Sequence, residues 1–285
     1  MKKTDLPFSI DLNGRTAVVT GAGGVLCSQF ARALAACGAS VALLDLNLDA
    51  AQAVADEITA TGGKAFAYKT NVLDKDSLEA VHQSVLKDLG TCDLLINGAG
   101  GNHPRATTSQ EYYDPSNIPA DTVTFFDLDK QGISFVFELN FLGTLLPTQV
   151  FAKEMVNRPG ASIINISSMN AFTPLTKIPA YSGAKAAISN LTQWLAVHFA
   201  RTGIRVNALA PGFFATKQNE KLLFTDDGQL TERSHKILSQ TPMGRFGDSK
   251  ELIGALLFLL SPEAAGFITG IVLPVDGGFS AYSGV

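Results

Sequence analysis

The sequence predicts an α/β fold with a doubly wound parallel sheet of about seven strands and helices on both of its faces. Short apolar runs alternate with longer helical patterns along almost the whole chain, and most of these runs are apolar on both faces. Strands of that kind are buried between two layers of helices. The intervening segments are ten residues or longer, which suits the right-handed crossovers between parallel strands. No linker or repeat interrupts the pattern, so we expect a single domain over residues 1–285.

Seven runs have the composition of buried strands, because apolar and β-branched residues dominate them. They are TAVVT (16–20), SVALLD (40–45), KAFAYKT (64–70), CDLLING (92–98), ASIINIS (161–167), IRVNALA (204–210) and IVLPVD (271–276). The segments between them repeat apolar residues at helical spacing, which predicts helices over 27–37, 48–61, 75–89, 132–157, 179–202 and 249–260. A sheet of this type binds its ligands at the carboxyl ends of its strands.

Two long segments leave that carboxyl edge without fitting the alternation. Residues 101–131 form a polar and aromatic stretch with three prolines after the fourth strand, and residues 212–247 follow the sixth strand. Long segments at such an edge usually serve as lids or binding loops. We therefore predict that both segments contribute to a binding site.

The overall composition narrows the class of protein. The net charge is −4 and no basic run is present, which argues against nucleic acid or an anionic membrane as a partner. The three cysteines lack metal-ligand spacing and the four histidines are scattered, so no metal site is predicted. The first residues have no apolar signal core, and the longest apolar run is about nine residues, against the roughly 20 that span a bilayer. We expect a cytoplasmic protein.

The stretch TGAGGVLCS (20–28) lies between the first strand and the first helix, where backbone amides and the helix dipole suit a pyrophosphate. Such a turn can also be a simple tight connection. Asp45 ends the second strand, where a carboxylate either is merely solvated or accepts hydrogen bonds from an adenosine ribose. Leu46 and Asn47 offer no cation for a 2′-phosphate, so the pattern favours NAD over NADP as the cofactor.

Four further motifs stand in order along the chain: NGAG (97–100), NISS (165–168), YSGAK (181–185) and PGFFAT (211–216). With them, residues 12–280 resemble the short-chain dehydrogenase/reductase superfamily, which has the Rossmann fold. A Tyr-x-x-x-Lys pair alone is common by chance, but here it follows Ser168 by thirteen residues. The resemblance implies an NAD-dependent oxidoreductase that transfers hydride between a nicotinamide and a substrate carbon.

The resemblance identifies the catalytic residues as Asn140, Ser168, Tyr181 and Lys185. An unperturbed phenol has a pKa of about 10 and exchanges protons poorly near neutrality. Lys185 follows Tyr181 by one helical turn, so we expect its ammonium to lower the pKa of the phenol. Ser168 is expected to orient the substrate oxygen, and Asn140 to hold a water that links Lys185 to solvent. Each of the four residue types also has ordinary structural uses.

The resemblance also implies the coenzyme contacts, which are Gly21, Gly23, Gly24, Val25, Leu26, Asp45, Asn71, Val72, Asn97, Gly98, Ala99, Tyr181, Lys185, Pro211, Gly212 and Thr216. The superfamily usually has glycine at positions 25 and 27, where this chain has Val25 and Cys27. We expect Gly23 and Gly24 to supply the permissive backbone angles instead. Asn71 replaces an expected aspartate, and its amide oxygen can still accept a hydrogen bond from adenine.

The interval from Asn97 to Asn140 is about forty residues, roughly twice what the superfamily often has. Together with SSMNAFTPLTKIPAYS (167–182) and the tail DGGFSAYSGV (276–285), it resembles the D-mannonate oxidoreductase (fructuronate reductase) group. The implied substrate is a keto sugar acid, D-fructuronate or D-mannonate. Arg105 is a candidate clamp for its carboxylate. The full set of expected substrate contacts is Asn102, His103, Arg105, Ser168, Asn170 and Lys217.

Two alternatives stay open. One is a reductase of another keto acid or polyol, such as a ketogluconate, and the other is a catalytically idle NAD(H)-binding sensor. The helices that carry Asn140 and Tyr181 are apolar on more than one face, which predicts burial against other subunits. The resemblance implies a homotetramer.

Overall fold

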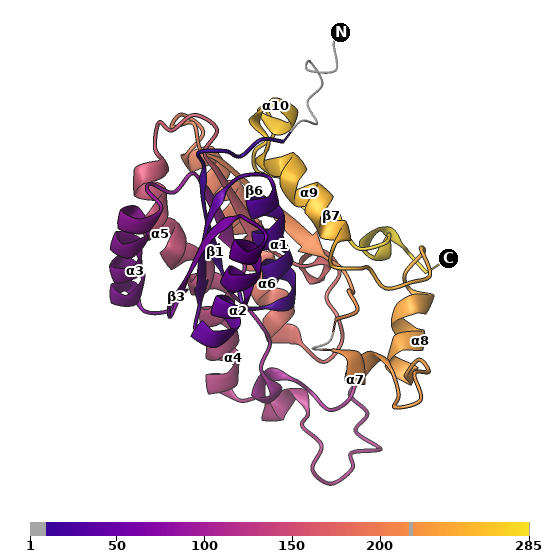
Figure 1. Cartoon of the computed structure of the whole chain (residues 1–285). Coiled ribbons are helices and arrows are strands. Elements are labelled where there is room, and N and C mark those ends of the chain that lie inside the picture. The colour runs from indigo at the N-terminus through magenta and orange to yellow at the C-terminus, as the bar shows by residue number, and fades with distance from the viewer. Residues whose placement is uncertain (1–9, 217–218, 285) are drawn as a thin grey trace.

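The computed structural model describes residues 10–216 and 219–284, and these contain a seven-stranded sheet with the order β3-β2-β1-β4-β5-β6-β7 (Figure 1). All six strand pairs are parallel. The strands are β1 (Thr16–Thr20), β2 (Ser40–Asp45), β3 (Lys64–Lys69), β4 (Leu94–Asn97), β5 (Ser162–Ile166), β6 (Arg205–Pro211) and β7 (Val272–Val275). The predicted α/β fold with a doubly wound sheet is confirmed.

The helices of the described chain are α1 (Val25–Ala36), α2 (Leu48–Ala60), α3 (Lys75–Asp88), α4 (Lys130–Phe137), α5 (Gly143–Met155), α6 (Pro179–His198), α7 (Glu220–Leu223), α8 (Glu232–Ser239), α9 (Glu251–Leu260) and α10 (Pro262–Ala265). Side chains cap the amino ends of several of these helices. For example, Asp74 is the N-cap of α3 and accepts hydrogen bonds from the backbone amides of Asp76 and Ser77. The helix predicted over 132–157 is divided, because Glu138–Leu142 form a π-helical turn between α4 and α5. Helices α7, α8 and α10 were not predicted.

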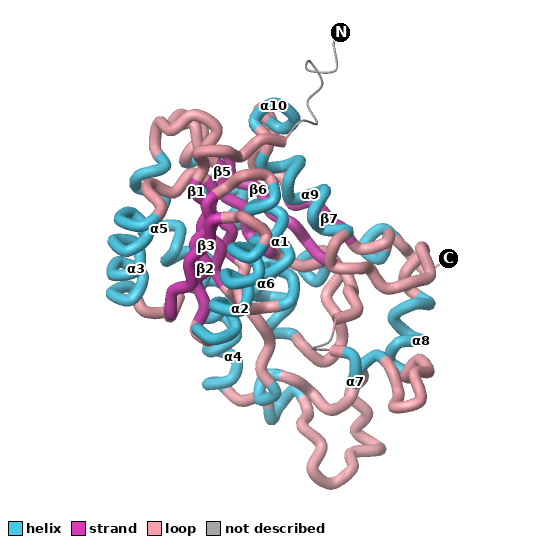
Figure 2. Tube along the Cα trace, in the orientation of Figure 1, coloured by secondary structure: helices cyan, strands magenta, loops and turns pink. Residues whose placement is uncertain are grey.

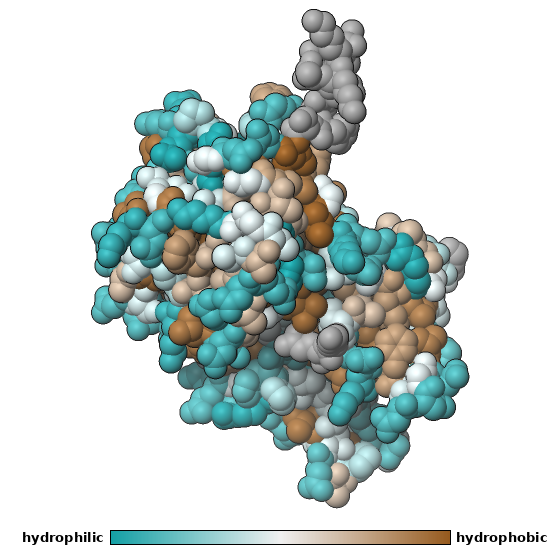
Figure 3. All heavy atoms as spheres, in the orientation of Figure 1, coloured by the Kyte–Doolittle hydropathy of each residue, from teal (hydrophilic) through white to brown (hydrophobic). Residues whose placement is uncertain are grey.

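The sheet separates two apolar layers, as its alternating side chains require. Along β5, Ile164 packs with residues of α1, α2 and α9, whereas Ile163 packs with residues of α3, α5 and α6. Hydrophilic side chains predominate on the outer surface over α3, at the left of Figure 3. Helices therefore cover both faces, and the carboxyl ends of the strands remain accessible between the two layers.

The strand order reverses at β1, which has β2 on one side and β4 on the other. At such a point the connections leave in opposite directions and open a crevice at the carboxyl edge. Residues 101–131 and helices α7 and α8 lie at this end of the molecule, at the bottom of Figure 1, and Figure 2 shows how much of both segments is loop. Lys236 in α8 pairs with Glu111 at 3.2 Å, so the two long segments contact each other.

One continuous helical stretch, Lys130–Met155, has the length and apolar composition of a membrane span. Half of its most apolar window is nevertheless buried inside the molecule. A core helix of a folded protein has the same composition, and this stretch supplies Val150 and Phe151 to the apolar layer under the sheet.

Candidate active site

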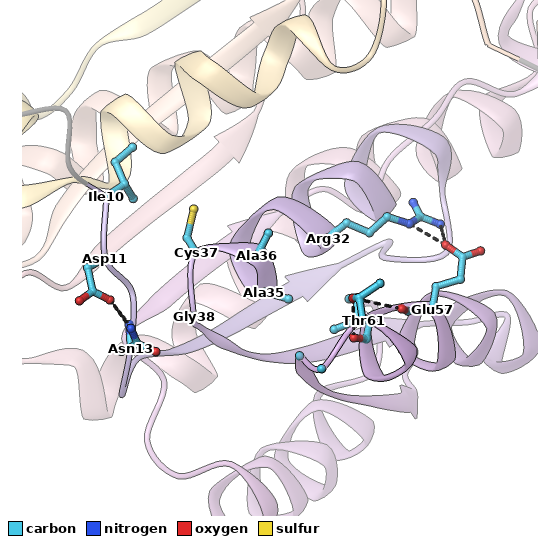
Figure 4. A pocket seen from close by; sticks show the side chains of 13 residues that line it. Ile10, Asp11, Asn13, Arg32, Ala35, Ala36, Cys37, Gly38, Glu57 and Thr61 are labelled. Carbon is cyan, nitrogen blue, oxygen red and sulfur yellow. Dashed lines mark hydrogen bonds and ion pairs between the residues drawn. The ribbon is translucent and has the colours of Figure 1, made fainter.

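One cavity of about 940 Å³ lies at the amino ends of β2 and β3 and is drawn in Figure 4. Its charged groups are engaged with one another. Arg32 pairs with Glu57 at 2.6 Å, and Asn13 donates to Asp11 at 2.6 Å. Because it lies at the edge opposite the strand carboxyl ends, and Arg32 and Glu57 neutralise each other in it, it is not the candidate site.

A second cavity of about 640 Å³ lies at the carboxyl ends of β1, β2, β4, β5 and β6. It is lined by most of the predicted coenzyme residues together with three of the predicted catalytic ones. These are Gly21, Gly23, Gly24, Val25, Leu26, Asp45, Asn71, Val72, Gly98, Ala99, Ser168, Tyr181, Lys185, Pro211, Gly212 and Thr216. Asn97 and Asn140 lie outside its wall. This cavity is the candidate active site.

The glycine-rich turn forms one end of the cavity, and its geometry differs from the sequence prediction. Gly21 has the positive φ, at 66°, whereas Gly24 has an ordinary extended conformation (φ −73°, ψ 159°) and precedes α1 as its N-cap. The expectation that Gly23 and Gly24 supply the permissive angles was therefore wrong. Gly23 is needed for space, because a Cβ there would lie 2.7 Å from the Cβ of Ala50. Val25 is the first helical residue, where a β-branched side chain is tolerated.

The turn fits a dinucleotide. Among the described residues no side chain caps the amino end of α1, so its first amides are available to a pyrophosphate. The lack of a side chain at Gly21 lets the turn pack against the Gly98–Ala99 backbone, where a Cβ would lie 3.0 Å from the Ala99 Cα. Asp45 accepts hydrogen bonds from the backbone amides of Gly23 and Asn47 at 2.9 and 2.8 Å, which fixes its carboxylate beside the turn. Each carboxylate oxygen keeps a further lone pair for a ribose hydroxyl.

Cys27 fills the floor of the cavity where the β4 turn approaches α1. A Cβ added at Gly98 would overlap the Cys27 Sγ and would lie 3.0 Å from the Thr20 carbonyl oxygen. Burial raises the pKa of the Cys27 thiol to about 12, so it packs as a neutral group. Sequence reasoning treated Cys27 and Gly98 separately, but the structure makes them one packing unit.

Ser168, Tyr181 and Lys185 meet at the other end of the cavity. Ser168 is the second residue after β5, and Tyr181 and Lys185 lie one turn apart near the start of α6. The Lys185 Nζ lies 5.5 Å from the centroid of the Tyr181 ring and donates to the Ile166 carbonyl at 2.9 Å. Lys185 is only 4% exposed and Ser168 8% exposed, so bulk water has little access to either group.

The electrostatics of this cluster correct the expectation about Tyr181. Burial raises the pKa of Tyr181 to about 12, and the smaller opposing effect is a hydrogen bond with the Ser168 side chain. Burial also lowers the pKa of Lys185 to about 8. The predicted lowering of the phenol pKa was wrong for this structure, because desolvation outweighs the hydrogen bond with Ser168, and the Lys185 ammonium is directed at the Ile166 carbonyl. The phenol is thus held in its protonated form.

Asn140 is fully buried within the π-helical turn. Its Nδ2 donates to the Gly101 and Val136 carbonyls, both at 2.7 Å, and its Oδ1 accepts from the Gly101 amide at 3.2 Å. A Cβ at Gly100 would lie 2.6 Å from that Oδ1 and 3.2 Å from the Lys185 Nζ. The backbone at Gly100 therefore brings Asn140 and Lys185 close together, a role that sequence reasoning missed although NGAG contains this glycine.

The predicted substrate residues are largely held by neighbours. Asn102 donates to Thr107 at 3.0 Å, and the His103 Nδ1 accepts from the Arg105 amide at 3.2 Å. The Arg105 Nη2 pairs with Asp129 at 2.6 Å. Asn170 differs, since it is 4% exposed and its Oδ1 has no partner among the described residues.

Lys217, the remaining predicted substrate contact, lies outside the described residues. In the described ranges, no group of three or more His, Cys, Asp or Glu side chains is arranged to hold a metal ion.

Comparisons with known proteins agree with this geometry. The family model for short chain dehydrogenases matches residues 15–226. The uncharacterised oxidoreductase UxuB of Bacillus subtilis is 54% identical over 280 residues, which are 98% of this chain and all of the relative. A Haemophilus influenzae protein, provisionally described as a D-mannonate oxidoreductase and crystallised with NAD, superposes with a TM-score of 0.94 at 62% identity, covering 96% of this chain and 98% of that one. A gluconate 5-dehydrogenase of Burkholderia cenocepacia, in complex with NADP and tartrate, has a TM-score of 0.82 at 28% identity, covering 97% and 99%.

The Cys27–Gly98 contact predicts a coupled pair of substitutions. Gly98→Ala should lower the free energy of unfolding by about 2 kcal/mol, because overpacking costs roughly 1–3 kcal/mol. In a Cys27→Ala background, the same change should cost at least about 1 kcal/mol less, since the overlapping Sγ is gone. Urea unfolding measures both values. Gly101→Ala is the control, because an added Cβ there meets nothing closer than 3.9 Å. An equal cost of Gly98→Ala in both backgrounds would contradict the packing described.

The buried Lys185 predicts a pH-dependent stability. Its pKa is about 8 in the folded chain, against the ordinary 10.5, so the unfolded chain binds the extra proton between these values. The free energy of unfolding of the original chain, relative to that of Lys185→Met, should therefore rise from pH 8 to 10.5 and level off above pH 10.5. Denaturant unfolding of both chains across this range measures the difference. A difference that stays constant over the range would show that the ammonium is not desolvated.

Proposed function

The chain belongs to the short chain dehydrogenase family and is an oxidoreductase that acts on alcohol groups, and we propose that it interconverts D-fructuronate and D-mannonate with NAD(H). The observation that carries the proposal is the meeting of Ser168, Tyr181 and Lys185 in the cavity that also holds the glycine-rich turn. The provisional description of the Haemophilus influenzae protein supports this choice of substrate.

NAD is the proposed coenzyme, in preference to NADP. A 2′-phosphate would meet the carboxylate of Asp45, and its neighbours Leu46 and Asn47 offer no compensating cation. The NAD in the Haemophilus influenzae structure supports the choice, whereas the Burkholderia cenocepacia enzyme contains NADP. We assign the sixteen predicted coenzyme residues to the binding of NAD. Asn97 would act indirectly, because it does not line the cavity and its side chain donates to Thr148.

The proposed mechanism uses Tyr181 as the acid. When bound, the nicotinamide coenzyme supplies hydride to the carbonyl carbon. The protonated Tyr181 phenol gives its proton to the oxygen on which charge develops, and its raised pKa keeps that proton in place beforehand. Ser168 shares a hydrogen bond with Tyr181 and orients the same oxygen. Lys185 stabilises the phenolate that remains. Asn140 is proposed to hold the water that links Lys185 to solvent, through which the phenolate is reprotonated.

A sugar acid requires a cation for its carboxylate and polar groups for its hydroxyls. The Arg105 Nη2 donates to Asp129 and Gln131, while its Nε and Nη1 have no partner among the described residues. These two groups lie on different edges of the guanidinium, and each can donate a hydrogen bond to a substrate carboxylate. The Oδ1 of Asn170, which has no partner among the described residues, is proposed to accept a hydrogen bond from a substrate hydroxyl. Asn102, His103 and Lys217 complete the proposed substrate residues.

Three further features are proposed with the function. Helices α4 and α6 expose Phe135, Phe137, Trp194 and Val197, by 41%, 39%, 58% and 79% respectively. We propose that other copies cover these side chains in a homotetramer. Light scattering tests this by returning the mass of four chains rather than one. We also propose that the chain forms a single domain and that it acts in the cytoplasm, which fractionation of the cell would test.

Turnover of a substrate panel separates the proposed function from its alternatives. With NADH as the coenzyme, turnover should be fastest with D-fructuronate and slower with ketogluconates and simple ketoses. Replacing NADH by NADPH should slow it further. Tyr181→Phe should lower kcat by roughly 10²–10⁴-fold, because the proton donor is lost, with NADH binding within about twofold of the original. Tyr112→Phe, at an exposed tyrosine, is the control. A faster ketogluconate would favour the alternative substrate, and NADH binding without turnover of any compound would favour the sensor.

Arg105 tests the class of substrate. Arg105→Met should raise KM for D-fructuronate by about tenfold or more, because charge-assisted hydrogen bonds to the carboxylate contribute about 1.5–3 kcal/mol. The KM for NADH and for a neutral ketose should not change. Gln131→Leu removes one neighbour of the guanidinium and is the matched control. Equal effects on the acid and the neutral ketose would contradict the assignment.

A further inference from the structure

Two buried asparagines face each other beneath the candidate active site. Asn97 ends β4 and Asn165 lies in β5, and the two residues are direct partners in the parallel register. They are 1% and 0% exposed. The Asn97 Nδ2 donates to the Asn165 Oδ1 at 2.9 Å. The two amides therefore connect the central strands by their side chains as well as their backbones.

Each asparagine also reaches a helix. The Asn97 Nδ2 donates to the Thr148 Oγ1 in α5 at 2.9 Å, and the Asn165 Nδ2 donates to the Thr192 Oγ1 in α6 at 2.9 Å. Thr148 is 2% exposed and Thr192 is fully buried. We name Asn97, Thr148, Asn165 and Thr192 the amide–threonine bridge. It runs from α5 through two strands to α6 without contact with solvent.

On the α5 side, the bridge continues to Asn140. The Thr148 Oγ1 donates to the Thr144 carbonyl at 2.8 Å, and the Thr144 Oγ1 donates to the Asn140 carbonyl at 2.9 Å. Each step is one helical turn. The carbonyl of Asn140 belongs to the π-helical turn, so Thr144 satisfies a backbone group beside the altered hydrogen-bond ladder.

On the α6 side, the neighbouring contacts lead to Lys185. The Thr192 Oγ1 donates to the Ile188 carbonyl at 2.8 Å, one helical turn below Lys185. Ser167, two residues after Asn165, donates to the Lys185 carbonyl at 3.1 Å and shares a hydrogen bond with Ser189 at 2.7 Å. Two residues of one chain segment, Asn165 in β5 and Ser167 just after it, are therefore hydrogen-bonded to α6 at Thr192 and Lys185.

Polar groups at these positions need a reason other than stability. Burying an amide costs free energy that its hydrogen bonds largely repay, and apolar side chains of the same shape would serve equally well. Apolar contact is non-directional and does not fix how far a helix slides or rotates on a sheet. Hydrogen bonds are directional, so the three that join the two asparagines to each other and to the threonines specify one arrangement of strands and helices. The Asn97 Oδ1 is the one polar side-chain atom of these four residues without a partner among the described residues.

We propose that the amide–threonine bridge is a positioning device that sets α5 and α6 in register, and with them Asn140 relative to Tyr181 and Lys185. Its four members are positioning residues, because none of them touches the reacting atoms. The proposal rests on the proposed function, since it concerns the alignment of the groups that carry out that reaction. A displacement of about 1 Å in such groups is enough to lower turnover.

The test replaces the two threonines by isosteres without a hydroxyl. Thr148→Val with Thr192→Val should lower kcat for D-fructuronate by about tenfold, while KM for NADH stays within about twofold. Thr148→Ser with Thr192→Ser keeps both hydroxyls and should restore kcat to within about threefold. Ser162→Ala is the control, because this hydroxyl is equally buried in β5 but has no partner in the described chain. An unchanged kcat, or serine variants as slow as the valine variants, would overturn the proposal.

A second measurement needs neither turnover nor the double variant. If the original chain turns over none of the compounds in the panel, the proposed function fails. The role of the amide–threonine bridge is then tested by the rate of amide hydrogen exchange in the single Thr148→Val chain. Exchange should quicken at least about tenfold in residues 138–142, which lie two helical turns away, and should not quicken in the Ser162→Ala chain. Unchanged protection in the π-helical turn would overturn the proposal independently of activity.

Discussion

The desolvated ammonium of Lys185 is the constraint on which the rest of the site depends. A charge that is 4% exposed is costly, and its partner is the Ile166 carbonyl at the end of β5, 2.9 Å away. That contact fixes α6 against β5 and thereby places Tyr181 over the cavity. It also requires Gly100, because a side chain there would crowd both the Lys185 Nζ and Asn140. Burial, packing and chemistry at this site therefore follow from one group.

Much of the fold could be predicted because its signals are local. Each of the seven strands lies within about two residues of its predicted run, since short apolar segments between helices leave few other arrangements. Parallel strands place their carboxyl ends along one edge, which is why Asp45, Ser168 and Gly212, far apart in the chain, line the same cavity. Motifs that follow different strands in the sequence are therefore neighbours in the folded chain.

The parts that could not be predicted depend on contacts between distant segments. The π-helical turn at Glu138–Leu142 is stabilised by the bonds of Asn140 to Gly101, which no helical periodicity contains. The positive φ of the turn lies at Gly21, where the Gly98–Ala99 backbone also leaves no room for a Cβ. The pKa of Tyr181 is raised rather than lowered because burial outweighs the hydrogen bond with Ser168, and burial is a property of the folded molecule. Arg105 is held from one side by Asp129, a partner in the same long segment.

In the proposed active site, a protonated phenol, a desolvated ammonium and an orienting hydroxyl meet at the end of a dinucleotide cavity. A crystal structure of the chain with NADH and D-mannonate tests this arrangement most directly, because this pair cannot react. We expect the hydroxyl on the reacting carbon to lie within hydrogen-bond distance of both the Tyr181 Oη and the Ser168 Oγ, with the nicotinamide on the adjacent face. A sugar acid that contacts neither oxygen, or a dinucleotide bound away from the turn at Gly21, would contradict it.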